Sequence, residues 1–407
     1  MTTLKPESET QLAETIRWAI SDKAPLELVG GGSKTMLGRP VNPGHRLDLS
    51  AFTGVGLYEP AELVLTAGPA TPMREMEALL AEQGQEFAFE PMDLGPLTGQ
   101  GEGAGTLGGA VMANLSGPRR IRQGAARDHL LGFRCVTGRG EIVKSGARVM
   151  KNVTGYDLSK LIAGSWGTLA AVTEVTLKVL PRAEKTRTLL LIGQDAQAAR
   201  IALSAALGSP YDVSGAAWLP AGIAARSGVG FIARAGGAVT AIRVEGPGPS
   251  VEDRMARLAE SLGEGVTVEE LHSHNSQAFW KELRDAMPFA GTGDTRAVWK
   301  ISTAPTEGPK LYAALSALPG FEAYLDWGGG LVWLATDAKG DAGEAAIRAA
   351  VASHGGHATL IRAPAAIRAA VPVFQPLDAG VMELQARIKD GFDPEAILNP
   401  ARMYEGV

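Results

Sequence analysis

Hydrophobic periodicity divides the chain near residue 181. In the first part, apolar residues at Leu12, Ile16 and Ile20 recur at helical spacing behind the pair Ser8 and Gln11, which predicts an amphipathic helix over residues 8–21. A proline after Thr71 and a glycine at position 84 bound a second predicted helix, with Thr71 as its cap. Short apolar runs bounded by Gly and Pro predict strands at residues 26–29, 46–49, 57–59, 63–67, 87–90, 130–137, 141–144 and 169–180.

Beyond residue 181 the pattern changes to helices and strands that alternate without glycine clusters. This alternation predicts an α+β layer that covers a ligand bound elsewhere in the chain. We find no internal repeats and no low-complexity linker. Strands are expected at residues 189–192, 239–245, 266–271, 297–302, 322–336 (a pair) and 358–362, and helices at residues 196–207, 250–262, 277–286, 310–318, 343–353 and 379–390.

Glycines gather at three places in the first part, at residues 30–32, 99–109 and 164–167. Such clusters mark backbone that takes unusual dihedral angles or approaches a ligand closely. The pair Gly108 and Gly109 opens a short apolar helix, whose bare N–H groups would attract phosphate. In residues 155–168, Asp157 is expected to cap one helical turn before the glycines that flank Ser165.

The first glycine cluster follows a predicted strand and continues into Ser33, Lys34 and Thr35. Consecutive N–H groups there could form an anion-binding nest. The spacing is neither that of a Walker loop nor that of a Rossmann turn, and an ordinary flexible turn is the alternative for this segment taken alone. Together the three clusters indicate a dinucleotide that lies across several loops.

Composition narrows the class of protein. The 407 residues are 45% hydrophobic and 20% charged, as in a soluble globular protein of two or three domains. A net charge of -5 argues against a nucleic-acid partner. The single cysteine, Cys135, excludes an internal disulfide framework and is expected in a buried strand. Without an apolar signal-peptide core or a transmembrane segment, the expected location is the cytoplasm.

Several charged and aromatic groups leave two interpretations open. Arg119, Arg120 and Arg122 form either a phosphate or partner patch or a solvated loop. The pair His272 and His274 could supply a base or a metal ligand, but also fits a polar loop that enters a helix. We therefore name no catalytic residue and no metal ligand.

Other side chains are open in the same way. Arg296 and Lys300 would share one face of a strand and could clamp a carboxylate, and a solvated face explains the same spacing. Lys34 or Lys151 could stabilise an anionic reduced flavin or could be a surface charge. Trp327 is interpreted as a core or subunit-contact residue.

Five motifs in order resemble the FAD-binding domain of the vanillyl-alcohol oxidase (PCMH) type, over residues 26–180 and 380–403. They lie at residues 30–33, 106–114, 127–132, 155–161 and 164–168, and the ending at 393–400 resembles the usual carboxy-terminal signature. Residues 37–40, 116–120, 149–153, 293–295 and 326–329 are in addition similar to the FAD-binding subunits of bacterial glycolate oxidase (glycolate dehydrogenase) complexes.

The resemblance implies an α+β fold with three parts. A two-subdomain PCMH-type FAD-binding domain would occupy residues 1–182, followed by an α+β, ferredoxin-like cap domain over residues 183–370. A C-terminal segment over residues 371–407 would return to complete the FAD site.

The resemblance also implies FAD as cofactor, bound without a covalent link because Ser33 and Lys34 stand where covalent members have a histidine. The first turn and the 106–109 segment would hold the pyrophosphate, the 164–168 loop the adenosine and ribityl part, and Val172 and Asn399 would approach from the strand and the chain's end. The implied cofactor-binding residues are Gly30, Gly31, Gly32, Ser33, Lys34, Thr106, Gly108, Gly109, Asn114, Gly155, Asp157, Gly164, Ser165, Gly167, Thr168, Val172 and Asn399.

The implied activity is oxidation of glycolate, a small 2-hydroxy acid, to glyoxylate. The implied partners are a second flavin subunit and an iron–sulfur subunit that receives the electrons, and such a complex could bring the chain to a membrane surface peripherally. Residues 326–333 keep the glycines of a His-x-Gly-Asp-Gly-x-x-His metal motif but lack both histidines. Two alternatives therefore stay open, an FAD-stabilised structural subunit without its own turnover and a self-sufficient flavin D-2-hydroxy-acid dehydrogenase.

Overall fold

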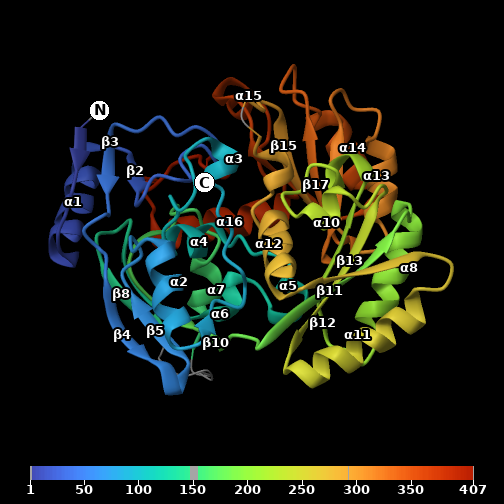
Figure 1. Cartoon of the computed structure of the whole chain (residues 1–407). Helices are drawn as coiled ribbons and strands as arrows, with labels where there is room; N and C mark the ends of the chain where they lie inside the picture. Colours follow the sequence, from blue (N-terminus) through green and yellow to red (C-terminus); the bar gives the residue numbers. More distant parts are fainter. Residues whose placement is uncertain (1, 147–154, 292, 407) are drawn as a thin grey trace. The chain divides into compact units, whose positions relative to one another are not determined.

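Three separate stretches of chain build the first of two structural units. The computed structural model describes residues 2–146, 155–291 and 293–406. The first unit lies within Met1–Ser116, Gly124–Arg182 and Pro376–Val407, and the second comprises Gly117–Gln123 and Ala183–Gln375 (Figure 1). The short segment Gly117–Gln123 is thus flanked in sequence by the first unit but belongs to the second.

A small parallel sheet opens the first unit. Strand β3 (His45–Asp48) lies between β1 (Thr2–Leu4) and β2 (Leu26–Val29). Helix α1 (Glu9–Asp22) begins as predicted at Ser8, whose hydroxyl accepts a hydrogen bond from the Gln11 N–H at 3.2 Å. The helix buries Leu12 and Ile16 in a core that also contains Leu398 from the C-terminal segment. Residues from the N-terminal and C-terminal segments therefore pack in one hydrophobic core.

A five-stranded antiparallel sheet forms the second layer of this unit. Its order is β4 (Val55–Glu59), β5 (Val64–Ala67), β9 (Ala170–Lys178), β7 (Leu130–Thr137) and β8 (Ile142–Gly146). The two sheets of the unit agree with the predicted two-subdomain FAD-binding fold. The helices of this layer are α2 (Met73–Glu82), α3 (Gly95–Thr98), α4 (Leu107–Ala113), α6 (Ala126–His129) and α7 (Leu158–Ile162).

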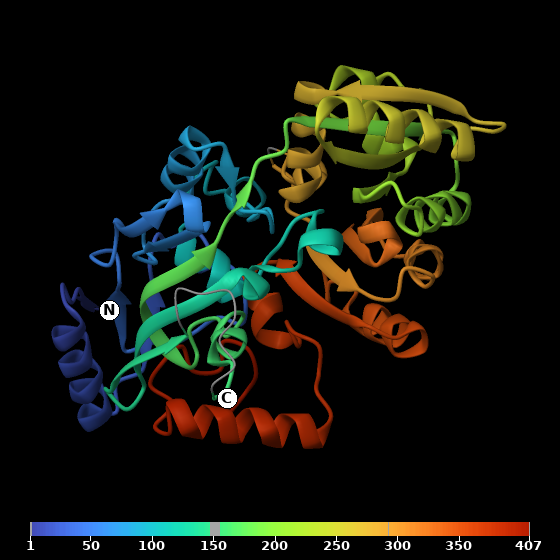
Figure 2. The same ribbon diagram turned by 90° about the horizontal axis from the view of Figure 1, so that it is seen from below.

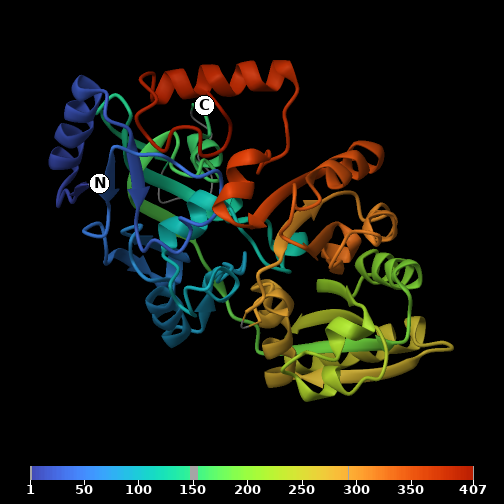
Figure 3. The same ribbon diagram turned by 90° about the horizontal axis from the view of Figure 1, so that it is seen from above.

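The C-terminal helix α16 (Ala379–Phe392) packs Ile388 and Phe392 against the core of the five-stranded sheet (Figure 3). A short pair of strands, β6 (Gln85–Glu86) and β10 (Leu180–Pro181), and the 3-10 turn at Pro60–Glu62 complete the unit.

The second unit contains an eight-stranded sheet in the order β14-β11-β13-β12-β16-β17-β15-β18. Its first half runs strand–helix–strand–strand–helix–strand, which is the ferredoxin-like connection. The elements are β11 (Lys185–Ile192), α8 (Ala196–Leu207), β12 (Val213–Leu219), β13 (Val239–Gly246), α11 (Gly248–Leu262) and β14 (Thr267–His272), with α9 (Ala221–Ala224) and α10 (Gly230–Ala233) between β12 and β13.

The second half repeats the same connection. It consists of β15 (Ala297–Ser302), α13 (Gly308–Leu315), β16 (Glu322–Asp326), β17 (Leu331–Thr336), α14 (Glu344–His354) and β18 (His357–Arg362). The two halves meet where Trp218 on β12 pairs with Leu325 on β16, and Figure 2 shows them as a yellow-green and an orange layer. The second unit therefore contains a tandem of two ferredoxin-like modules, a structural repeat that the sequence did not reveal.

Further elements of the second unit are α5 (Arg120–Gln123), α12 (Ser273–Arg284), α15 (Ala365–Ala370) and the 3-10 turns Met287–Phe289 and Trp327–Gly329. No helix within the described residues combines the length and the hydropathy that a membrane crossing requires.

Several local features differ from the sequence-based prediction. Residues 87–90 do not form a strand, although Phe87 and Phe89 are buried. The strand pairing lies earlier in the chain, at Gln85–Glu86. Helix α2 begins one residue late, and the Thr71 hydroxyl instead donates to the Gly68 carbonyl at 2.7 Å. Strand β12 was missed because its residues are all buried, so polar and apolar positions do not alternate.

Candidate cofactor-binding site

A cavity in the first unit collects backbone from all three of its chain stretches. Its empty volume is about 780 Å³, part of it open to solvent. Among the predicted site residues, the cavity wall includes Gly30, Gly31, Gly32, Ser33, Lys34, Thr106, Gly108, Gly109, Gly167, Val172 and Asn399.

The turn after β2 presents unused donors to this cavity. Among the described residues, the backbone N–H groups of Gly30, Gly31, Gly32 and Ser33 donate no hydrogen bond. A Cβ on Gly31 would lie 2.8 Å from Thr106 Cγ2 and 3.2 Å from the Ala104 carbonyl oxygen, so only glycine lets the turn approach α4 this closely. Consecutive free N–H groups of this kind can bind a phosphate or diphosphate.

The start of α4 is used differently from the sequence-based prediction. Thr106 caps the helix by accepting from the Gly109 N–H at 3.2 Å, while the Gly108 N–H donates to the Pro69 carbonyl at 2.7 Å. A Cβ on Gly108 would meet Pro69 at 2.4 Å. Gly108 therefore permits close packing of α4 on the 69–71 segment, and its amide is already engaged.

The 164–168 loop is fixed to the end of α4. The N–H groups of Gly164 and Trp166 donate to the carbonyls of Val111 and Met112 at 3.2 and 3.0 Å. Trp166 lines the cavity with a positive φ of 56°, a value that glycine takes freely and tryptophan rarely. The loop is thus held in an unusual conformation beside the cavity.

The C-terminal segment ties these loops together. The Asn399 side chain accepts from the Leu28 N–H and donates to the Trp166 carbonyl, both at 2.9 Å, so it joins β2 to the 164–168 loop. Arg402 donates to the Lys34 carbonyl at 2.6 Å. Asn399, which the sequence analysis predicted to contact the cofactor, thus holds two walls of the cavity in place.

A buried ion pair supports this closure. Lys389 Nζ lies 2.7 Å from Asp393 Oδ2 and donates to the Thr168 carbonyl at 2.6 Å. Asp393 also accepts from the Ile397 and Leu398 N–H groups at 3.0 and 2.8 Å. Because both charges are buried and fully hydrogen-bonded, the end of α16 is fixed relative to the 164–168 loop.

Lys34 is the cation of the cavity wall whose side chain is unpaired. It forms no hydrogen bond or ion pair among the described residues, and its Nζ would lie 3.4 Å from a Cβ on Gly109. Burial lowers the pKa of Lys34 to about 8, against the opposing attraction of Asp93. The cavity therefore combines four free amide donors with one unpaired amine.

Comparison with known proteins supports a family assignment. Residues 2–146 match the model of the FAD binding domain family. The glycolate oxidase subunit GlcE of Escherichia coli is 36% identical over 401 residues, covering 97% of this chain and 96% of that protein. The chain belongs to the GlcE family. It is an FAD-binding protein of the oxidoreductase type.

Other similarities bound the assignment. The glycolate oxidase subunit GlcD of Bacillus subtilis is 26% identical over 48% of this chain and 40% of its own length. The 4-ethylphenol oxidase of Gulosibacter chungangensis superposes with a TM-score of 0.73 at 14% identity, covering 99% of this chain and 89% of that one, which shows a shared fold.

The wall of this GlcE-family cavity fits FAD. The free amides of residues 30–33 and the Lys34 amine match a group with two negative charges, and the missing Cβ of Gly31 lets this turn pack closely against Thr106.

Six predicted site residues lie outside the cavity wall of the described chain: Asn114, Gly155, Asp157, Gly164, Ser165 and Thr168. Asn114 ends α4 with a φ of 48° and accepts from the Arg127 N–H at 3.0 Å. Asp157 caps α7 by accepting from the Lys160 N–H at 3.2 Å. The Thr168 carbonyl faces Lys389. Several of these residues therefore shape neighbouring loops, and their contact with a cofactor stays a prediction.

Other wall residues escaped the sequence analysis: Leu28, Val29, Thr35, Leu49, Pro69, Ala70, Met112, Ala113, Trp166, Ala170 and Arg402. Met112, Ala113 and Trp166 lie inside the motifs at residues 106–114 and 164–168, and Thr35 follows the first glycine motif, so the motifs could have identified them. Leu49, Pro69 and Arg402 come from unrelated parts of the chain, and only the tertiary fold brings them to the cavity.

The second unit of this GlcE-family chain holds a separate cluster of cations around Trp327. Arg120 Cζ lies 4.5 Å and Lys300 Nζ 5.0 Å from the centre of its ring, and the indole N–H donates to the Gly117 carbonyl at 3.1 Å. Burial, reinforced by the charge of Arg120, lowers the pKa of Lys300 to about 8, against the opposing attraction of Asp326. Lys300 makes no hydrogen bond or ion pair among the described residues. The cluster thus places the Lys300 amine beside Arg120, Asp326 and the Trp327 ring.

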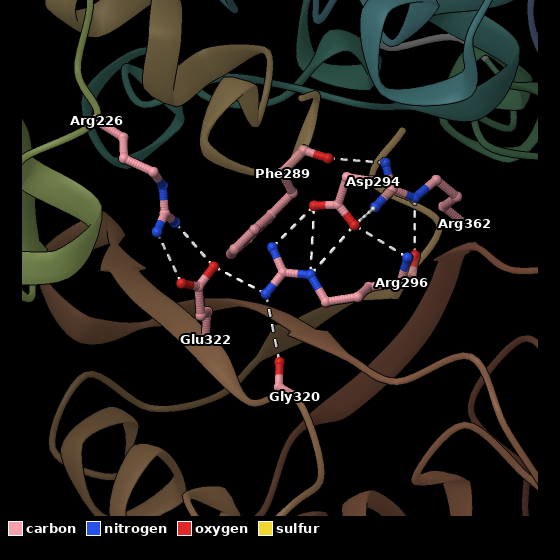
Figure 4. A network of polar contacts seen from close by, with 7 residues as sticks. All are labelled: Arg226, Phe289, Asp294, Arg296, Gly320, Glu322 and Arg362. Atoms are coloured by element: carbon pink, nitrogen blue, oxygen red, sulfur yellow. Dashed lines mark hydrogen bonds and ion pairs between the residues drawn. The ribbon is translucent and has the colours of Figure 1, made fainter. Parts of the chain in front are cut away.

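Arg296 does not belong to that cluster. Its guanidinium contacts Asp294 and Glu322, each at 2.8 Å, and Arg226 and Arg362 pair with the same two acids (Figure 4). The side chain is thus fully engaged in a network that joins the start of β15 to β16. Arg296 and Lys300 therefore do not form the carboxylate clamp that was one of the two interpretations of this pair.

The remaining candidates fall outside these sites. Arg119 pairs with Glu245 at 2.7 Å and Arg122 with Asp212 at 2.6 Å, so both fasten α5 within the second unit. The His272 side chain is mostly exposed. No group of three or more His, Cys, Asp or Glu side chains within the described chain could hold a metal ion. Lys151 lies outside the described residues.

Proposed function

We propose that this chain is the FAD-binding subunit of a multi-subunit glycolate oxidase or dehydrogenase, which oxidises glycolate to glyoxylate. Its partners are a second flavin subunit and an iron–sulfur subunit that accepts the electrons. The observation that carries the proposal is the cavity with free amides at residues 30–33, in a chain similar over nearly its whole length to a glycolate oxidase subunit.

FAD is held without a covalent link. A covalent flavin bond requires a nucleophilic His, Cys or Tyr side chain, and the described residues that line the cavity include none of these types. Denaturation should therefore release all of the flavin into solution, which ultrafiltration and absorbance spectroscopy of the filtrate measure.

The reaction removes a hydride from the alcohol carbon of glycolate and a proton from its hydroxyl. Bound FAD supplies the acceptor for the two electrons. Lys300 is suited to hold the substrate carboxylate, because its amine makes no hydrogen bond or ion pair among the described residues. Asp326 accepts a hydrogen bond from the backbone N–H of Trp327 at 2.6 Å, while the indole N–H donates to the Gly117 carbonyl.

Substitution of Lys300 tests this role. Lys300→Met should raise KM for glycolate about tenfold to a hundredfold while the flavin content stays unchanged, because a charged hydrogen bond to the carboxylate is lost. Lys310→Met is the matched control, since Lys310 is an exposed lysine paired with Glu307. An unchanged KM in the Lys300 variant would remove the carboxylate from this cluster.

A second candidate is an FAD-loaded subunit that leaves substrate turnover to the partner flavin chain. The residues 326–333, in which both histidines of the metal motif are absent, favour it. Anaerobic addition of glycolate to the purified chain separates the two. Bleaching of its flavin band shows turnover on this chain, whereas bleaching only after the partner subunits are added assigns the substrate site to them.

Activity of the assembly with flavin-free protein would instead leave this chain a scaffold. Such an outcome overturns the proposed redox role but not the binding of FAD.

A further inference from the structure

The turn that offers free amides to the cavity ends in an amine that has no hydrogen bond or ion pair among the described residues. Lys34 is half-buried in the cavity wall, and its Nζ makes no hydrogen bond or ion pair among the described residues. A lysine amine that burial removes from water is usually paired with an acid or an acceptor. An unpaired amine beside four unused N–H groups indicates that its partner is a ligand.

The charged groups around Lys34 do not fill that role. Asp93 is the acid whose field reaches Lys34, but its two oxygens accept from the Gly95 and Gly103 N–H groups at 3.0 and 2.7 Å. Arg402, packed on the same turn, donates to the Lys34 carbonyl and adds positive charge. The wall near Lys34 therefore carries a surplus of donors and cations over acceptors.

We propose that the Lys34 amine is the charged partner of the FAD pyrophosphate and that cofactor binding is coupled to protonation of this side chain. The inference rests on FAD binding and is independent of any 2-hydroxy-acid oxidation. Backbone amides alone could hold the pyrophosphate at any pH, and Lys34 makes the affinity depend on pH.

The direction of this dependence follows from the two states of the amine. Without cofactor, burial places the pKa of Lys34 at about 8, and a bound diphosphate raises it because opposite charge favours the protonated form. Below that pKa the amine is charged in both states, so affinity is constant. Above it, binding must take up a proton, and the affinity for FAD falls by up to about tenfold per pH unit.

Titration of the flavin-free full-length chain with FAD tests the proposal. Binding would be followed by flavin fluorescence from pH 6.5 to 9.5, and by calorimetry in buffers of different ionisation enthalpy to count protons. We expect constant affinity up to about pH 8, a decline above it, and uptake approaching one proton.

Three variants separate charge from packing. Lys34→Met should weaken FAD about tenfold to a hundredfold near pH 7 and abolish proton uptake, whereas Lys34→Arg should keep the affinity and lose the pH dependence. Arg39→Met is the matched control, because Arg39 lies in the same loop outside the cavity wall and pairs with Glu405. Circular dichroism of each flavin-free variant checks that the fold is kept.

ADP and FMN locate the contact on the cofactor. A loss of ADP affinity in Lys34→Met that matches the loss for FAD supports the pyrophosphate. A loss for FMN with unchanged ADP affinity overturns the pyrophosphate assignment. FAD affinity in Lys34→Met within twofold of the Arg39→Met value, or no proton uptake by the unmodified chain above pH 8, overturns the proposal as a whole.

Discussion

At the scale of single residues, the shape of the cavity depends on a glycine that has no side chain. Gly31 has no positive φ, so its role is not backbone freedom but the space that its absent Cβ leaves beside Thr106. Thr106 cannot turn away at no cost, because its hydroxyl caps α4 by accepting from the Gly109 N–H. The turn and the helix therefore fit each other only with glycine at position 31.

The variant Gly31→Ala should bind FAD at least tenfold more weakly. The new methyl group would lie 2.8 Å from Thr106 Cγ2, and overpacking of this kind costs about 1–3 kcal/mol and displaces the turn. The measurement is the dissociation constant from flavin fluorescence. Gly105→Ala is the control, because no atom lies within 4 Å of a Cβ at that position. Equal affinities in the two variants would contradict the tight-packing argument.

At the scale of elements, the C-terminal segment completes a site whose other walls lie far away in the sequence. The Asn399 amide bridges β2 and the 164–168 loop, and the Lys389–Asp393 pair holds the end of α16 to Thr168. Each contact joins the last part of the chain to backbone at the cavity. The C-terminal segment therefore holds β2 and the 164–168 loop in place through its side-chain hydrogen bonds.

We expect Asn399→Gly to lower FAD affinity about tenfold and the free energy of unfolding by about 1–3 kcal/mol. Glycine accepts the φ of 42° at this position, so the effect reports the loss of the two amide hydrogen bonds. Fluorescence titration and urea unfolding measure the two quantities. Ala396→Gly is the matched control, an exposed position of the same segment with a φ of 48°. An FAD affinity equal to that of the Ala396→Gly control would show that the Asn399 hydrogen bonds are not needed for FAD binding.

At the scale of the whole molecule, the segment Gly117–Gln123 belongs to the second unit, although the residues before and after it in the sequence belong to the first. Arg119 fastens it by pairing with Glu245 on β13, which Arg243 also approaches at 3.5 Å. Burial alone would raise the pKa of Glu245, but Arg243 and Arg119 outweigh it and hold the pKa at about 2. The stability of the second unit therefore depends on a buried carboxylate.

Acid should weaken the second unit over a defined range. The folded pKa of Glu245 is depressed from an ordinary value of 4.5, so its contribution is complete above pH 4.5 and is lost as pH falls towards 2. The contribution is about 3 kcal/mol. Urea unfolding between pH 6 and 3 should show a smaller pH dependence in Glu245→Gln.

Glu252→Gln provides the comparison, because Glu252 is mostly exposed in its pair with Arg187. That variant should keep the acid sensitivity of the unmodified chain. An identical pH dependence in Glu245→Gln would assign the acid sensitivity to other carboxylates.

The sequence by itself determined the elements that depend on local chemistry. Capping, turns and periodicity are short-range effects, so nearby residues determine several features. These are the helix N-cap at Ser8, the β7–β8 hairpin, the glycine turn after β2, and the alternating helices and strands of the second unit. The order of the glycine motifs also indicated FAD.

Only the tertiary structure decided how distant residues are used. It brought Pro69, Leu49 and Arg402 to the cavity, and it gave Asn399 and Asp157 hydrogen-bonding roles that motif matching could not supply. It also paired β12 with β16 and so joined two ferredoxin-like modules without any repeat in sequence. The physical reason is that long-range packing and pairing depend on which surfaces meet, and a one-dimensional pattern of residues does not specify that meeting.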